Sequence, residues 1–281
     1  VKNTSAFTSS LKKAQQNKKI CILQVAPAVR VSVGELFGEY PGTVVTGKIV
    51  SAAKQLGFDY VFDTCFGADV TSIEEGEEFL QRLTTNGTLP LFTSCCPAWV
   101  NFVEKLHPEL MSNLSSTKSP HMILGTLIKT YFARRLNVNH DDLYVVSLMP
   151  CVAKKMEIKR MQLKGDVDAV IIPQEFHDMI QLVNINWHSL KLMEFDSILG
   201  ESSGAGNIFG ASGGVTELVV RYVHENLTGR KLLDHLQYSK WRGNESLKKA
   251  ELSFDIPEVK GQKAQTIHLK IAVCNGIKAA K

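Results

Sequence analysis

The sequence lacks a long apolar run, an internal repeat and a concentrated basic tract. No stretch approaches the ~20 consecutive apolar residues of a membrane-spanning helix, so no membrane span is predicted. The net charge is only +4 and the basic residues are scattered, which argues against a nucleic-acid-binding face. The absence of repeats argues against a solenoid. What remains is ordinary soluble globular composition, with 281 residues, 44% hydrophobic and 21% charged.

Cysteine is also scarce. The six cysteines are Cys21, Cys65, Cys95, Cys96, Cys151 and Cys274. Most stand at the ends of apolar, strand-like runs, and no secretory signal is visible, so a disulfide framework explains them poorly. They are better interpreted as buried free thiols or as ligands of a metal or cluster.

Apolar runs rich in β-branched residues alternate with helical patterns along the chain. Strands are predicted at residues 20–27, 60–64, 89–94, 143–149, 168–172 and 268–273. Helices are predicted at residues 33–36, 46–56, 71–83, 98–105, 119–135, 174–182 and 215–227. This alternation predicts an α/β fold, with two lobes of mostly parallel sheet flanked by helices. Because chemistry collects at the carboxyl ends of parallel strands, the active site is expected in the cleft between the lobes.

The predicted domain organisation has three parts. Residues 1–17 are polar and form an N-terminal arm or peripheral helix, residues 18–139 form the first lobe, and residues 140–281 form the second. The boundary is placed at a polar break between Asn137 and Asp141. The chain begins with valine and stops where another helix is predicted to begin, so we expect it to be a fragment of a longer protein.

Two cysteine motifs stand between a predicted strand and a helix. Residues 93–99 read TSCCPAW, so Cys95 and Cys96 fall in a turn before a helix that starts near Pro97. The positive end of a helix favours thiolate, the form that binds iron. Residues 149–155 read MPCVAKK, where lysines one turn after Cys151 suit a thiolate or an anionic ligand. Taken singly, each motif also fits small buried side chains and surface lysines.

Together the two motifs resemble the signatures of the iron-only (di-iron) hydrogenases, which read T-S-C-C-P-G-W and M-P-C-x-x-K-K. Three further stretches resemble the family in the same order: FDTCFGAD at 62–69, NLSSTKSP at 113–120 and SGAGNIFGASGGV at 203–215. The resemblance covers about residues 18–281 and identifies the chain as similar to the catalytic domain of that family.

The resemblance implies a cofactor and its ligands. The family binds a 4Fe–4S cubane joined through a cysteine sulfur to a di-iron unit with CO, cyanide and dithiolate ligands, together called the H-cluster. Four cysteines hold the cubane, and by match Cys96 and Cys151 are two of them. The other two belong to a third motif, near C-x-x-x-C, which lies downstream of the last residue here. Cys274 matches no ligand and is interpreted as a buried thiol at a strand end.

The resemblance also implies a proton path. Cys95 matches the proton donor to the bridging amine of the di-iron unit, and from it a relay passes to Glu75, Ser115 and Glu78. The two glutamates are three residues apart and therefore share one helix face. Without the resemblance, the acidic residues of this helix would be interpreted as a solvated surface.

Other residues match the surroundings of the cofactor. Lys154 matches the lysine that hydrogen-bonds a cyanide ligand. Residues that line the di-iron cavity are matched by Pro27, Met149 and Phe209. Four positions depart from the usual family sequence: Ala28 for serine, Ala98 for glycine, His121 for glutamine and Thr216 for methionine. None of the four removes a ligand. No C-x-x-C-x-x-C cluster of an accessory iron–sulfur domain is present.

The implied function is reversible formation and oxidation of H2, with ferredoxin or a similar electron carrier and with maturation proteins as partners. The expected compartment is the cytoplasm or a hydrogen-producing organelle. Two alternatives stay open, a non-catalytic iron–sulfur assembly factor and a sensor of H2 or redox state. Assembly factors typically lack the first of the paired cysteines, and sensors often alter the relay. Both features are intact here, which favours the enzyme, although the fragment alone is expected to be inactive.

Overall fold

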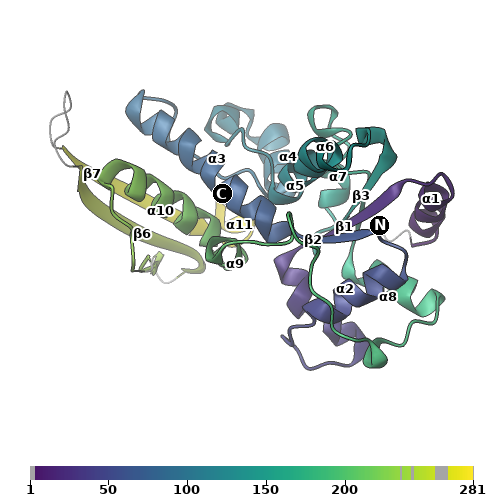
Figure 1. Ribbon diagram of the computed structural model, residues 1–281. Helices are drawn as coiled ribbons and strands as arrows, with labels where there is room; N and C mark the ends of the chain where they lie inside the picture. Colours follow the sequence, from purple (N-terminus) through teal and green to yellow (C-terminus); the bar gives the residue numbers. More distant parts are fainter. Residues whose placement is uncertain (1–3, 235, 242–243, 257–264, 281) are drawn as a thin grey trace. The chain divides into compact units, whose positions relative to one another are not determined.

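The computed structural model describes residues 4–234, 236–241, 244–256 and 265–280. It separates into two compact units (Figure 1). The first unit runs to Thr71 and resumes from Lys118 to Asn207, and the second comprises Ser72–Thr117 and the chain from Ile208 onward. Each unit is described separately below.

The first unit is built on a parallel sheet of four strands in the order β2-β1-β3-β4. The strands are β1 (Ile20–Val25), β2 (Tyr60–Asp63), β3 (Leu143–Leu148) and β4 (Ala169–Ile171). In the central strand β1, Leu23 pairs with Val61 on one side and with Val146 on the other. The near-continuous burial of β1 and β3 is typical of parallel strands that are covered on both faces.

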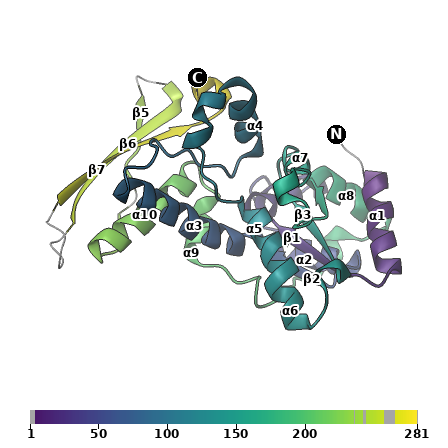
Figure 2. The ribbon, with the colours of Figure 1, turned by 90° about the horizontal axis from the view of Figure 1, so that it is seen from above.

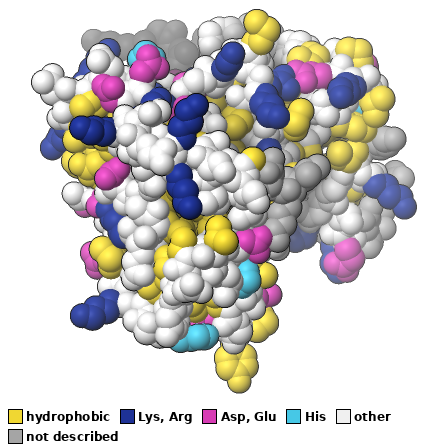
Figure 3. Space-filling view, turned by 90° about the vertical axis from the view of Figure 1, so that its right-hand side faces the viewer, with side chains coloured by type: hydrophobic (Ala, Val, Ile, Leu, Met, Phe, Trp, Pro, Cys, Tyr) yellow, Lys and Arg dark blue, Asp and Glu magenta, His cyan; other side chains and the backbone are white. Residues whose placement is uncertain are grey.

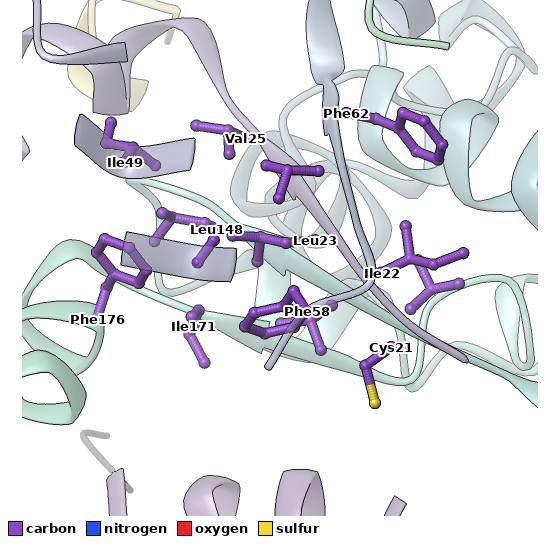
Figure 4. Close-up of a cluster of buried hydrophobic side chains, with 14 of the residues drawn as sticks. Cys21, Ile22, Leu23, Val25, Ile49, Phe58, Phe62, Leu148, Ile171 and Phe176 are labelled. Atoms are coloured by element: carbon purple, nitrogen blue, oxygen red, sulfur yellow. The ribbon is translucent and has the colours of Figure 1, made fainter. Parts of the chain in front are cut away.

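Helices cover both faces of this sheet. Helices α2 (Thr46–Gln55) and α8 (Pro173–Leu182) lie on one face, and α5 (Pro120–Leu127) and α6 (Ala133–Leu136) lie on the other (Figures 1 and 2). Between them is the main hydrophobic core, in which strand residues such as Leu23 and Leu148 meet Ile49 and Phe176 from the helices (Figure 4). Helix α1 (Thr4–Gln16) lies within the predicted N-terminal arm and buries Phe7 and Leu11.

The first unit also contains several shorter elements. They are the 3-10 helices η1 (Pro27–Val31), η2 (Val33–Phe37), η5 (His140–Asp142), η6 (Met161–Leu163) and η7 (Trp187–Ser189), the π-helix η4 (Ile128–Phe132), and the α-helices α7 (Lys154–Glu157) and α9 (Gly204–Phe209). Helix α9 continues past Asn207 into the second unit. The helix predicted at 33–36 is therefore a 3-10 turn, and the helix predicted at 119–135 is interrupted by a π-helical turn.

The second unit combines helices with an antiparallel sheet. Its helices are α3 (Thr64–Thr84), which starts in the first unit, α4 (Pro97–Leu106), α10 (Gly214–Thr228) and α11 (Ile277–Ala280), with the 3-10 helix η3 (Pro108–Asn113). The sheet has the order β5-β6-β7, with β5 (Ser239–Trp241), β6 (Asn244–Ile256) and β7 (Gln265–Cys274). A small core forms where Val220 of α10 packs with Ala250, Phe254 and Leu269 of the sheet (Figure 1).

The structure confirms the α/β class, with a parallel sheet flanked by helices, but corrects several details. The second sheet is antiparallel, because β6 and β7 pair in opposite directions over their whole register. The strand predicted at 89–94 makes a single bridge, between Phe92 and Leu114, and Pro90 has no N–H to extend a ladder there. The predicted break at Asn137–Asp141 does not coincide with a boundary of the compact units, because the chain returns through β3 to pair with β1.

The surface carries mixed charge. On the face shown in Figure 3, Lys and Arg side chains are interspersed with Asp and Glu and with apolar groups, as the scattered basic residues of the sequence predict. Among the described helices, none has the length and apolar character needed to cross a membrane.

Candidate functional site

The paired cysteines lie in an extended segment that leads into α4. Cys96 is the N-cap residue, with extended backbone angles (φ −97°, ψ 107°), and Pro97 occupies the first turn, as its fixed φ favours. Cys95 is half-buried and Cys96 is exposed. The segment is held by Ser94, whose amide donates to Glu75 Oε1 (3.2 Å) and whose hydroxyl donates to the Thr117 carbonyl (2.9 Å). The two thiols therefore directly follow Ser94, which is hydrogen-bonded to α3 through Glu75.

Glu75 is a carboxylic acid in an unusually dry position. Its side chain is fully buried on α3, and its Oε2 accepts no hydrogen bond within the described part of the chain. Burial raises the pKa of Glu75 to about 7, although the Ser94 amide and the Ser115 hydroxyl act in the opposite direction. A carboxyl group with a pKa near neutrality can both accept and release a proton at physiological pH.

Glu78, one turn further along α3, is surrounded by donors. Its Oε2 accepts hydrogen bonds from the Ser115 hydroxyl (2.8 Å), the Ser116 amide (2.9 Å) and the Ser116 hydroxyl (3.2 Å), and its Oε1 pairs with Arg82 Nη2 (2.6 Å). Partial burial raises the pKa of Glu78, but the two serines and Arg82 outweigh it, so the pKa is lowered overall. Glu78 is thus an ionised acceptor close to an acid that titrates near neutrality.

A surface hollow in the second unit gives solvent access to Glu78. It is lined by Glu74, Glu77, Glu78, Gln81, Ser116 and Thr117. The Tyr222 hydroxyl donates to Glu77, one of the residues that line the hollow. Glu78 therefore meets solvent, and the Ser115 hydroxyl that donates to Glu78 also acts to lower the pKa of the buried Glu75.

Arg82 is a residue of this site that the sequence interpretation missed. Besides pairing with Glu78, it donates to the carbonyls of Thr88, Ser112 and Leu114, at 3.0, 3.0 and 2.9 Å. One guanidinium therefore ties the segment that leads to Ser115 onto α3. The spacing of four residues between Glu78 and Arg82 is a helical ion-pair signal that was present in the sequence.

The second cysteine motif lies in the first unit, just after β3. Cys151 is half-buried, and its carbonyl accepts from the Lys154 amide (3.2 Å) as the chain turns into α7. Lys154 Nζ lies 2.8 Å from Glu157 Oε2, one helical turn away. The backbone of Lys154 is therefore tied to Cys151, and its ammonium group is paired with a carboxylate of its own helix.

Two of the predicted lining residues lie near this motif. Met149 is buried and follows β3 directly, and Pro27 starts η1 after β1. The amide of Ala26 donates to the Leu148 carbonyl (3.1 Å), so the carboxyl ends of these strands adjoin. Phe209 belongs to the second unit, with Cys95, Cys96, Glu75, Glu78 and Ser115, whereas Pro27, Met149, Cys151 and Lys154 belong to the first.

The other cysteines are less suited to bind iron. Burial raises the pKa of Cys21 to about 11 and that of Cys65 to about 12, so both stay protonated thiols. Cys274 closes β7 and is exposed, which corrects the prediction of a buried thiol. The reason is that it belongs to a two-layer unit whose sheet ends near solvent.

The thiols of Cys96 and Cys151 are the candidate ligands of an iron–sulfur cluster. Cys96 is the exposed N-cap residue of α4 in the second unit, and Cys151 is a half-buried free thiol in the turn before α7 in the first unit. Within the described residues no three His, Cys, Asp or Glu side chains converge as a metal-ion site. Each of the two thiols is therefore of the type that binds the iron of an iron–sulfur cluster.

Comparison with known proteins agrees with this chemistry. Iron hydrogenase 1 of Clostridium pasteurianum is 44% identical over 242 residues, which are 85% of this chain and 42% of the relative. The periplasmic Fe hydrogenase large subunit of Nitratidesulfovibrio vulgaris is 41% identical over 276 residues, 96% of this chain and 65% of that protein. The chain thus spans between about two fifths and two thirds of the length of these relatives.

Solved structures and more distant relatives give the same picture. A variant of the FeFe-hydrogenase HydA1 from Chlamydomonas reinhardtii superposes with a TM-score of 0.84 at 34% identity, covering 96% of this chain and 76% of that one. A probable cytosolic Fe-S cluster assembly factor of Nematostella vectensis is 33% identical over 258 residues, 86% of this chain and 58% of the relative. Residues 19–281 match the family model described as iron only hydrogenase large subunit, C-terminal domain. The chain therefore belongs to the family of iron-only hydrogenase large subunits and represents its C-terminal domain.

Proposed function

We propose that this chain is the proton-handling and cluster-binding part of an enzyme that interconverts H2 with two protons and two electrons. The observation that carries the proposal is the pair Glu75 and Glu78. One is a buried acid with a pKa of about 7, and the other is an ionised carboxylate that opens to a surface hollow. A structural ion-pair network has no need of a buried acid without a cationic partner among the described residues, whereas a proton path does.

The protein's own residues act as follows in this proposal. A proton enters at Glu78, whose carboxylate accepts the Ser115 hydroxyl at 2.8 Å. For the proton to move inward, the protonated Glu78 carboxyl gives its proton to the Ser115 oxygen while the Ser115 hydroxyl gives its own proton to the Glu75 carboxylate, on which it acts to lower the pKa. Glu75 holds the proton beside the Ser94 amide, one residue before Cys95. The thiol of Cys95 is the last donor, next to the cluster.

The cofactor fits the other matched residues. Cys96 and Cys151 would hold the cubane, Lys154 would donate to a cyanide ligand, and Pro27, Met149 and Phe209 would keep water from the di-iron unit. When bound, the H-cluster supplies electron storage and the iron at which H2 is made or split. A reduced ferredoxin or a similar carrier is the proposed electron partner, and maturation proteins are proposed to insert the di-iron unit.

The second candidate is a non-catalytic iron–sulfur protein. It is supported by the cluster assembly factor from Nematostella vectensis, whose identity to this chain is 33%. An assembly factor needs cluster ligands but has no use for Cys95 or for a proton path. The presence of Cys95 beside Cys96, with the Glu75 and Glu78 arrangement behind it, favours the enzyme.

The test compares H2 turnover with iron content in the full-length protein. Cys95→Ser is expected to reduce turnover by about 10²- to 10⁴-fold, the usual size of a lost acid–base group, while cluster iron stays bound. Cys151→Ala is the control for ligation and is expected to lower iron content and the cluster's EPR signal. A wild-type protein with full clusters and no H2 turnover would assign the chain to the non-catalytic relatives.

A further inference from the structure

His121 lies at the centre of a buried polar chain in the first unit. It stands in the first turn of α5 and is only 1% exposed. Its Nδ1 lies 3.1 Å from the Ser147 hydroxyl on β3, and its Nε2 lies 2.7 Å from Glu157 Oε2. Its backbone carbonyl accepts from Gln24 Nε2 on β1 (2.8 Å). The ring is therefore anchored at both nitrogens and its backbone is tied to the sheet.

The neighbours define the protonation state of this ring. Burial opposes ionisation of Glu157, but the His121 hydrogen bond and the charge of Lys154 outweigh it and lower the Glu157 pKa to about 2. Burial also lowers the pKa of His121, with Lys154 acting in the same direction and Glu157 against it. The imidazole is thus neutral, with Nε2–H donating to the carboxylate and Nδ1 accepting the Ser147 hydroxyl.

One carboxylate oxygen joins His121 to Lys154. Glu157 Oε2 accepts from His121 Nε2 at 2.7 Å and from Lys154 Nζ at 2.8 Å. A lysine on a flexible stem does not fix the rotamer of a glutamate three residues away, whereas a ring held at both nitrogens does. The position of the Lys154 ammonium group therefore depends on His121, which lies on a different helix and acts through Glu157.

We propose that His121 is a positioning residue for Lys154, holding Glu157 in the single orientation that keeps the ammonium group in place. The inference depends on the proposed function only for the role of Lys154, as a donor to an anionic cyanide ligand. Because the imidazole is neutral, Glu157 and Lys154 neutralise each other, and His121 adds direction without adding charge. An apolar residue of similar size would fill the space but leave Glu157 free to rotate.

The first test measures Lys154 itself in the full-length protein before cluster insertion. Competitive acylation with an amine-reactive ester, followed by peptide mass spectrometry, reports how firmly each lysine is held. His121→Leu is expected to increase Lys154 labelling by about tenfold, the size expected for a lost hydrogen bond to a charged group. His121→Gln keeps one donor and one acceptor, so labelling is expected to stay near the wild-type rate.

Lys155 serves as an internal control. It pairs with the buried carboxylate of Glu175 at 2.6 and 2.7 Å, outside the His121 cluster. Its labelling is expected to be unchanged in every variant. Equal increases at Lys154 and Lys155 would indicate general loosening and overturn the positioning role, as would unchanged Lys154 labelling in His121→Leu.

Two further measurements keep the proposal falsifiable. If His121→Leu does not fold, Ser147→Ala removes only the hydroxyl at Nδ1, and it too is expected to increase Lys154 labelling selectively; no increase would overturn the proposal. In the cluster-loaded enzyme, the infrared cyanide bands are expected to shift in His121→Leu and to return toward the wild-type frequencies in His121→Gln. The labelling result does not depend on H2 turnover, so a protein that makes no H2 can still confirm or contradict the role of His121.

Discussion

Glu157 in the first unit and Glu75 in the second are both almost fully buried, at 5% and 0% exposure, yet burial affects their carboxyl groups in opposite ways. Glu157 faces an ammonium and an imidazole N–H, and its pKa falls to about 2. Glu75 has only uncharged donors near it, the Ser94 amide and the Ser115 hydroxyl, and its Oε2 has no hydrogen-bond partner among the described residues, so burial raises its pKa to about 7. The contrast shows that partners, not depth, decide whether a buried acid holds a charge permanently or exchanges a proton.

Substitution of Glu157 is expected to have the largest effect on stability. Glu157→Gln keeps the shape but removes the charge that compensates Lys154, and we expect a loss of about 3 kcal/mol in the free energy of unfolding. Denaturant titration of the full-length protein measures it. Glu109→Gln, in an exposed pair with His107, is the matched control and should leave the free energy of unfolding nearly unchanged, because solvent screens exposed pairs. Equal changes in the free energy of unfolding for the two variants would mean that the buried Glu157 pair stabilises the fold no more than an exposed pair.

Glu75 should show the opposite behaviour with pH. Its folded-state pKa of about 7 exceeds the ordinary 4.5, so the folded protein retains a proton that the unfolded chain releases. The stability that it contributes is complete below pH 4.5 and is lost as the pH rises through about 7. Glu75→Gln should remove this dependence and be more stable than the wild type above neutral pH, by roughly 3 kcal/mol.

The same substitution should slow H2 turnover by about 10²-fold or more, because glutamine cannot carry a proton. Urea unfolding across the pH range and a turnover assay check the two halves separately. Parallel stability profiles for the wild type and Glu75→Gln would contradict the raised pKa, and unchanged turnover would remove Glu75 from the proton path.

Substitution of Arg82 is expected to bring the pKa of Glu78 closer to the raised pKa of Glu75. Arg82→Gln should raise the pKa of Glu78, because the positive charge that holds it down is removed. It should also cost about 1–2 kcal/mol of stability through the lost hydrogen bonds to backbone carbonyls. Carboxyl NMR titration and denaturant unfolding measure the two effects. Arg134→Gln, at an exposed position, is the control and should be nearly neutral in both.

The smallest expected effect concerns His121. Its pKa is lowered below the ordinary 6.5, so the unfolded chain takes up a proton that the folded protein does not. Stability should therefore fall as the pH drops below 6.5, a slope opposite in sign to that of Glu75. His121→Gln should remove this acid-side loss while leaving the Glu75 dependence intact. An unchanged profile in that variant would show that the imidazole is not neutral in the folded state.

Local sequence patterns predicted the positions of most strands of the parallel sheet but not the pairing of every strand or the start of every helix. The ends of strands β1, β2, β3 and β4 were predicted to within two residues, because continuous β-branched runs are typical of buried parallel strands. The bounds of β6 and its register against β7 were not predicted, since β6 lies in a mixed, polar stretch without a clear period. The start of α3 at Thr64 was also missed, because the run from Cys65 to Asp69 has no polar face that marks a surface helix.

By itself the sequence determined the order of the motifs, the family they resemble, and the spacing that puts Glu75 and Glu78 on one face of a helix. It did not determine that Glu75 is dry while Glu78 is surrounded by donors, that Arg82 ties α3 to the segment before Ser115, or that His121 stands behind Glu157. Those outcomes depend on residues 19 to 37 positions away, brought close only by packing. Desolvation and hydrogen bonding act over a few ångströms of space, so only the tertiary structure decides which acid is charged.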